Sequence, residues 1–249
     1  MSVVSKSPVR IVGESDLDFI YGSIHDDYFD LSRDDDDLKI IGFHGDDTIF
    51  SGLGDDILVG GAGNDFIFAN AGSNSLRGGT GNDHLLSKID HGTVRGDYRD
   101  VMDGGVGDDV LASESSQNCT MNGGAGNDFF SFRDLGAAQS GVSYCIGGEG
   151  KDSFNFFEFQ ASEDADPNNT IVRIKDFDVG IDSLKFHFYG DEYQTNADTS
   201  FIVTQKGANM VIDFQDKVSI ILHGIDSQEV AMSDLFNTDD LGPIDPILF

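Results

Sequence analysis

Aspartate and glycine recur with a period of nine residues, in a pattern that suits the binding of a hard cation. Residues 60–68 (GGAGNDFIF) fit the form G-G-x-G-x-D-x-U-x, where U is a large apolar residue. The nonapeptides that begin at Gly78, Gly104, Gly123 and Gly147 fit it as well. Each aspartate, at position 6, supplies carboxylate oxygens, the ligand type that calcium prefers.

Imperfect copies extend the pattern. The copy that begins at Ser51 lacks only its first glycine, and the copy that begins at Gly42 has Phe43 in the second position. Weaker copies begin at Gly13, Gly22 and Ala69. We therefore treat residues 13–156 as a repeat array before considering any other fold.

Each position of the nonapeptide has a physical reason. Glycine permits positive φ angles and close backbone approach in a tight turn. The x-U-x triplet predicts a short strand whose middle residue points inward. Two nonapeptides then form one turn of a flattened right-handed coil, with a loop at each edge. The inward residues are Ile49, Leu58, Ile67, Leu76, Leu85, Leu111, Phe130 and Phe154.

These motifs resemble the RTX, or haemolysin-type, calcium-binding repeats. The resemblance implies a parallel β-roll in which several Ca²⁺ ions lie between successive loops, held by backbone carbonyls and the aspartate at position 6. The implied binding residues are Asp27, Asp47, Asp56, Asp65, Asp83, Asp109, Asp128 and Asp152, with Gly45, Gly54, Gly61, Gly63, Gly79, Gly81, Gly105, Gly107, Gly124, Gly126, Gly148 and Gly150. The alternative is a set of Gly/Asp turns that hold no metal.

The spacing of the aspartates predicts two unlike edges. Every second repeat places its aspartate in one series, Asp27, Asp47, Asp65, Asp83, Asp109, Asp128 and Asp152, which we expect to stack on one edge. The opposite edge keeps the motif at Asp56 and, weakened, at Asn74. Beyond Asn74 we expect four irregular loops: 87–103, 112–122, 131–146 and 157–170.

The irregular edge is the candidate for ligand binding, because binding residues usually lie on loops held by a rigid scaffold. Arg95, Arg99, Arg133 and Tyr144 would suit an acidic polysaccharide. The alternative is that these segments are tolerated insertions, since surface loops accept added length at little cost.

Residues 171–186 contain I-x-D-F-x-x-G-x-D-x-L-x-F, which resembles the segment after the β-roll in serralysin-type proteases and in the R-modules of mannuronan C5-epimerases. The resemblance implies a further calcium near Asp176 and Asp182. Alternating runs at 201–205, 210–214 and 218–222 predict a small antiparallel sheet that closes the roll. Phe154, Phe156, Phe157 and Phe159 are expected to cap the open end of the coil.

Composition narrows the possible partners. The chain has 45 acidic and 15 basic residues among 249, a formal net charge of −30, which excludes a nucleic-acid partner and favours bound cations. Twenty Phe and six Tyr oppose a disordered chain. The two cysteines, Cys119 and Cys145, form no disulfide framework, and Cys145 has the parity of a buried thiol. No stretch is long and apolar enough for a membrane span.

The predicted fold is therefore all-β: a parallel β-roll, or right-handed solenoid of nonapeptide repeats, closed by a small C-terminal antiparallel sheet. We divide the chain into a lead-in at 1–12, the β-roll at 13–156, a capping β region at 157–236 and a tail at 237–249. The N-terminus does not resemble a Sec signal peptide. The tail, with acids before a short apolar end, resembles a signal for the type I secretion machinery, and its alternative is a terminal strand.

Catalytic signatures are not found in the sequence. There is no H-E-x-x-H for zinc, no G-x-S-x-G and no phosphate loop. We therefore expect a secreted or cell-surface protein that folds on binding extracellular calcium and has a structural or interaction role. The alternatives are a carbohydrate-binding module and an enzyme whose site lies on the irregular edge.

Overall fold

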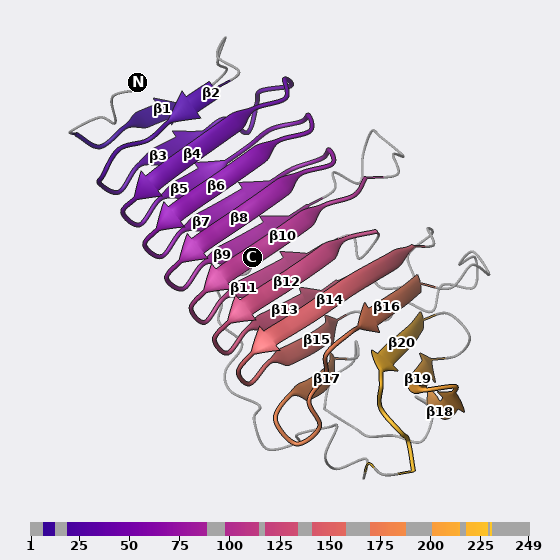
Figure 1. The fold of residues 1–249 in the computed structure, drawn as a ribbon. Helices are drawn as coiled ribbons and strands as arrows, with labels where there is room; N and C mark the ends of the chain where they lie inside the picture. Colours follow the sequence, from indigo (N-terminus) through magenta and orange to yellow (C-terminus); the bar gives the residue numbers. More distant parts are fainter. Residues whose placement is uncertain are drawn as a thin grey trace.

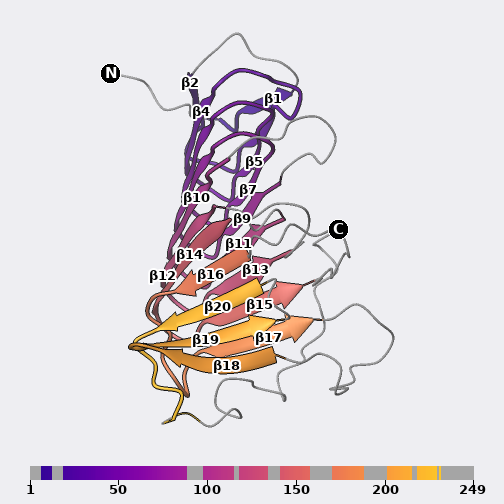
Figure 2. The same ribbon diagram turned by 90° about the vertical axis from the view of Figure 1, so that its right-hand side faces the viewer.

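The computed structural model describes residues 7–12, 19–88, 98–114, 118–133, 141–157, 170–187, 201–214, 218–228 and 230. These residues form two sheets on opposite sides of a flattened coil, with strands stacked along one axis (Figures 1 and 2). In the described part of the chain no helix is long and apolar enough to cross a membrane.

The nine-stranded sheet has the order β1-β3-β5-β7-β9-β11-β13-β15-β17 and is parallel throughout. Its strands are β1 (Arg10–Val12), β3 (Tyr28–Asp30), β5 (Thr48–Phe50), β7 (Phe66–Ala69), β9 (His84–Ser87), β11 (Val110–Ser113), β13 (Phe129–Phe132), β15 (Ser153–Phe157) and β17 (Ser183–His187).

The eleven-stranded sheet has the order β18-β19-β20-β16-β14-β12-β10-β8-β6-β4-β2. Its strands are β2 (Phe19–Tyr21), β4 (Lys39–His44), β6 (Ile57–Ala62), β8 (Ser75–Thr80), β10 (Val101–Val106), β12 (Thr120–Ala125), β14 (Val142–Glu149), β16 (Thr170–Ile174), β18 (Phe201–Lys206), β19 (Asn209–Phe214) and β20 (Val218–His223). The chain therefore alternates between the sheets, and each coil turn adds one strand to both.

The inward side chains set the register of the coil. Ile49 lies opposite Ile67, 18 residues on, and Leu85 lies opposite Leu111, 26 residues on. Insertions therefore lengthen the loops and leave the strand pairing unchanged. The eight residues predicted to point inward are all essentially inaccessible, at 0–1% exposure, so this prediction is confirmed. Full burial of such a side chain contributes roughly 1.5–3 kcal/mol.

The coil continues for one turn beyond the last nonapeptide. β16 pairs in parallel with β14, and β17 pairs in parallel with β15. β20 then adds to β16, and β19 and β18 follow antiparallel, which confirms the predicted C-terminal antiparallel sheet. At the other end, β1 lies in the segment predicted as a lead-in and pairs with β3.

The predicted aromatic cap is wrong for Phe154 and Phe156. Phe154 and Phe156 are fully buried inside the coil, where their rings stack on Phe130 (4.7 Å between centroids) and Phe132 (5.2 Å). The extra turn places Phe186 over Phe156 at 5.2 Å. Because β16 and β17 continue the sheets, these rings fill the core instead of ending it. Phe159 lies outside the described residues.

The cysteines are free and buried, as predicted for Cys145. The Cys119 thiol donates to Ser143 Oγ at 3.2 Å. Burial raises the pKa of Cys119 to about 11 and that of Cys145 well above its usual value. Both thiols are therefore protonated and unreactive in the folded protein.

Glycine is required where successive turns touch. Gly79 has φ +130°, and a Cβ built on it would lie 2.0 Å from the carbonyl oxygen of Gly61 in the preceding turn. We predict that Gly79→Ala costs more than about 3 kcal/mol of unfolding free energy, from backbone strain and this contact. Urea denaturation in calcium measures the loss.

Gly207 is the matched control. It also has a positive φ, +67°, but nothing lies within 4 Å of the position that a Cβ would occupy. Gly207→Ala should therefore cost only about 1 kcal/mol, the backbone term alone. Equal losses at the two positions would contradict the importance of the contact between turns.

Candidate metal centre

A column of aspartates runs along one edge of the coil, which we call the first edge. It consists of the turns that lead from the eleven-stranded sheet to the nine-stranded sheet (lower left in Figure 1). The backbone N–H of each position-6 aspartate donates to Oδ1 of the next one, at 2.7–2.9 Å. The column comprises Asp27, Asp47, Asp65, Asp83, Asp109, Asp128 and Asp152. The predicted stacking on one edge is confirmed.

The second carboxylate oxygen is different. Within the described part of the chain, Oδ2 is buried and has no hydrogen-bond partner in five members of the column and in Asp56 on the opposite edge. These are Asp47, Asp56, Asp65, Asp83, Asp109 and Asp128. A buried unpaired carboxylate oxygen is costly unless a cation or proton reaches it. These atoms therefore fit a metal ion.

Position-1 glycine makes room for that oxygen. A Cβ on Gly60 would lie 2.1 Å from Oδ2 of Asp65, and a Cβ on Gly123 would lie 2.1 Å from Oδ2 of Asp128. On the first edge a Cβ at position 1 would therefore displace the carboxylate, and the first glycine of the motif serves the metal-binding oxygen directly. On the opposite edge the loops of Asp56 and Asn74 carry Ser51 and Ala69 at position 1.

Burial raises the pKa of seven aspartates on the two edges. The pKa is raised to about 7 for Asp47 and Asp83, and to about 6 for Asp56, Asp65, Asp109, Asp128 and Asp152. Neighbouring aspartates add to the effect, as Asp65 and Asp27 do at Asp47. Without a cation, the column thus holds like charges close together in a place that excludes water.

The remaining ligands must come from the main chain. The described residues contain no group of three or more His, Cys, Asp or Glu side chains that could hold a metal. Main-chain carbonyls, however, point along the coil: the oxygen of Gly63 lies 2.1 Å from the Cβ position of Gly81, and that of Gly81 lies 2.0 Å from the Cβ position of Gly107. One carboxylate with several carbonyls is an oxygen-rich set that suits calcium.

A second row on the first edge was not foreseen from the sequence. At position 5, each side chain accepts a hydrogen bond from the position-5 N–H of the following turn, at 2.7–3.0 Å. The acceptors are Asp26, Asp46, Asn64, Asn82, Asp108 and Asn127. The recurrence of Asp or Asn immediately before the position-6 Asp was the available signal. This exposed row holds adjacent loops in register.

The opposite edge, here the second edge, keeps a hydrogen-bond register that the sequence did not indicate. The N–H of Leu38 donates to Asp56, that of Asp56 to Asn74, and that of Asn74 to Asp100, at 2.8–3.0 Å. The motif stops at Asn74 on this edge, as expected, but the hydrogen-bond register continues to Asp100. Asp100 and Leu38 escaped detection because their loops lack the motif glycines.

Three further predicted aspartates have both carboxylate oxygens bonded to the protein. Asp27 Oδ2 accepts from Ser23 N at 2.5 Å, and Asp182 Oδ2 accepts from Asp178 N at 2.8 Å. Asp176 accepts from the N–H groups of Gly147 and Gly148, at 2.9 and 3.0 Å. Asp182 also continues the aspartate column, through Asp152 N at 2.9 Å.

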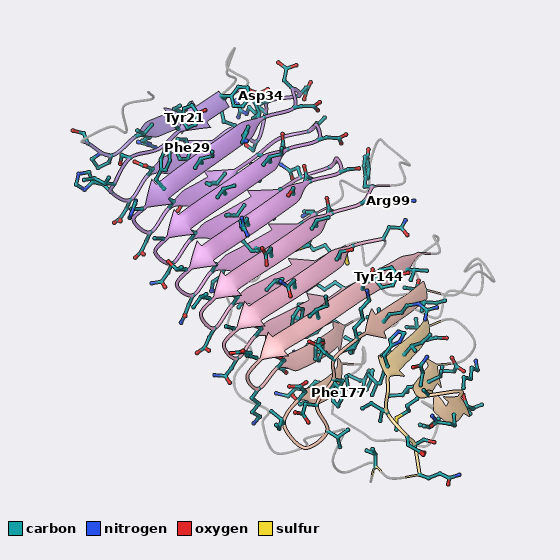
Figure 3. The ribbon with its side chains drawn as sticks, in the orientation of Figure 1. Tyr21, Phe29, Asp34, Arg99, Tyr144 and Phe177 are labelled. Atoms are coloured by element: carbon teal, nitrogen blue, oxygen red, sulfur yellow. The ribbon has the colours of Figure 1, made fainter. Side chains whose placement is uncertain are left out.

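The residues proposed for polysaccharide binding are spread over different elements. Arg99 is exposed on the second edge before β10, whereas Tyr144 lies on β14 (Figure 3). The Arg133 guanidinium lies 5.3 Å from the Phe157 ring, and the Lys175 ammonium lies 4.9 Å from the Tyr144 ring. Arg95 lies outside the described residues.

The fold and its edges define a class: a parallel β-roll whose loops stack aspartate carboxylates and glycine carbonyls. The family model of the RTX calcium-binding nonapeptide repeat matches residues 10–38, 39–58, 52–85, 96–116 and 120–132. The matched residues, fewer than half of the chain, are thus RTX calcium-binding repeats, and several repeats imply several calcium ions. The matched segment 96–116 includes Asp100, which the structure places in the repeat register.

Comparisons with curated proteins and with solved structures do not narrow the function of the chain. A search of the curated proteins finds no match. Among solved structures, the extracellular lipase LipA from Serratia marcescens is 18% identical, over 94% of this chain and 40% of the lipase chain, with a TM-score of 0.27. The chain therefore spans less than half the length of that lipase.

The raised pKa values predict how stability depends on pH without calcium. These carboxyls bind protons more tightly folded than unfolded, so stability should fall as the pH rises from about 4 to 7. Each pKa unit corresponds to about 1.4 kcal/mol for one group. Circular dichroism of the chelated protein at several pH values between about 4 and 7 follows the folded fraction and so measures the slope. Asp65→Asn should make it shallower, and stability that rises over this window would contradict the assignment.

Proposed function

We propose that the column on the first edge, together with Asp56 on the second, holds the calcium ions, and that the protein folds when it meets extracellular calcium. The supporting observation is the set of buried Oδ2 atoms without a partner. Asp47, Asp56, Asp65, Asp83, Asp109 and Asp128 would each contribute this oxygen. Main-chain carbonyls of the neighbouring glycines would complete each site, and the ion would neutralise charge and join two turns.

The physical chemistry of the column supports a folding switch. Without calcium, the net charge of −30 and the stacked carboxylates oppose the compact state. Because each ion binds the folded chain and links adjacent turns, its binding free energy becomes folding free energy. Coupling between neighbouring turns makes the transition cooperative.

Calcium availability would then determine where the chain folds. Extracellular calcium, at about 10⁻³ M, fills binding sites whose affinity lies in the range typical of extracellular modules. Cytosolic calcium is too scarce to fill such sites. A chain that stays unfolded inside the cell is suited to export by the type I machinery. We propose a secreted or cell-surface location and a structural or interaction role without catalysis.

The first test titrates calcium into chelated protein, with circular dichroism and calorimetry as readouts. We expect a cooperative coil-to-β transition near millimolar calcium, with several ions bound per chain. If the chelated chain stays folded and calcium does not change its spectrum, the aspartates only stabilise the turns. That result would overturn the proposal.

Two variants with the same change of charge locate the sites. Asp65→Asn removes one column carboxylate and should raise the calcium concentration at the folding midpoint several-fold. Asp226→Asn changes an exposed aspartate outside the roll, whose Oδ1 accepts only a local bond from Gln228 N at 2.9 Å. It should leave the midpoint nearly unchanged, and similar shifts in the two variants would point to net charge instead of bound ions.

A further inference from the structure

The two edges differ in what hydrogen-bonds to the second polar atom of the position-6 side chain. Asn74 on the second edge shows this most clearly. Its Oδ1 accepts from Asp56 N at 3.0 Å, as a column aspartate would. Its Nδ2 donates to the carbonyl oxygen of Asn70, four residues earlier, at 2.9 Å. In the motif, this carbonyl belongs to position 2 of the same loop.

In an aspartate loop the same two positions present acceptors only. Asp56 Oδ2 makes no hydrogen bond, although the Ser51 hydroxyl, which also has no partner, lies near enough to offset part of the rise that burial causes in the Asp56 pKa. Residue 52, at position 2, offers a carbonyl. Two oxygens with lone pairs repel each other unless a cation or a donor lies between them. The Asn74 amide is such a donor, built into the chain.

Asp100, the next member of the second edge, is satisfied in another way. Its Oδ1 accepts from Asn74 N at 2.8 Å, and its Oδ2 accepts from the hydroxyl of Ser87. Asp100 is only 4% exposed, so its carboxylate is buried yet fully hydrogen-bonded. On the other side of Asp56, Leu38 occupies position 6 and offers no oxygen from its side chain.

We infer that protein donors replace calcium on the second edge at Asn74 and Asp100, so that among the described residues of this edge the calcium ligand is Asp56. The inference rests on the proposed function, because it assumes that unpaired column oxygens bind ions. On this inference, the number of ions per chain depends on two features of each loop. They are the residue type at position 6 and whether the protein supplies a hydrogen-bond donor to it.

The test is a gain of site. Asn74→Asp replaces the amide donor with a carboxylate oxygen and should bind one calcium more per chain than the wild type, by calorimetry and native mass spectrometry. Asn82→Asp is the control: it adds the same charge at an exposed position 5, where Asp108 already occurs, and should leave the number unchanged.

The outcomes separate the two ideas. If the wild type binds several ions and Asn74→Asp binds the same number, the inference about the second edge fails and the proposed function stands. If the wild type binds none, the proposed function itself fails.

If Asn74→Asp does not fold, a second pair of variants tests whether an amide can replace the calcium ion. Asp56→Asn and Asp56→Ala should each take up one ion fewer on folding, measured from the dependence of the folding equilibrium on calcium concentration. Asp56→Asn should then need less calcium than Asp56→Ala to reach its folding midpoint, because its amide can donate to the position-2 carbonyl. Equal midpoints would overturn the idea that an amide substitutes for the ion.

Discussion

The structure depends on one shared contact, in which an aspartate of one turn accepts the backbone N–H of the turn before it. Oδ1 of each column aspartate is used in this way, as at Asp65 and Asp83. The bond fixes the spacing of the turns, and in five of the column aspartates Oδ2 is left buried without a partner. The same geometry that orders the loops therefore creates a line of carboxylate oxygens that only cations or protons can satisfy.

Close approach of the loops makes this line possible. The oxygen of Gly61 lies where a Cβ of Gly79 would be, and Oδ2 of Asp65 lies where a Cβ of Gly60 would be. Between the sheets, stacked apolar side chains such as Leu58 and Ile67 keep the turns aligned. The apolar core stabilises each turn, whereas the carboxylates oppose the stack until their charge is neutralised, so calcium and core act on the same equilibrium.

The two edges share a backbone register but differ in chemistry. The first edge repeats aspartate at position 6 in every nonapeptide, whereas the second edge carries Leu38, Asp56, Asn74 and Asp100. Farther along, Cys119 N donates to Ser143 Oγ at 3.3 Å, so the register outlasts the motif. The inward side chains keep this alignment while the loops vary in length, because strand pairing does not depend on what connects the strands.

The sequence alone determined the coil, its inward residues and the aspartate column, because each follows from a strict period that places like residues on like positions. It also predicted the antiparallel strands, whose alternation is local. Only the tertiary structure decided which carboxylate oxygens are left unpaired, that the coil extends through β16 and β17, and that Asp100 occupies the repeat register. Those outcomes depend on contacts between residues 13 to 30 positions apart, and no local pattern of Ser87 or Asp100 encodes their hydrogen bonds.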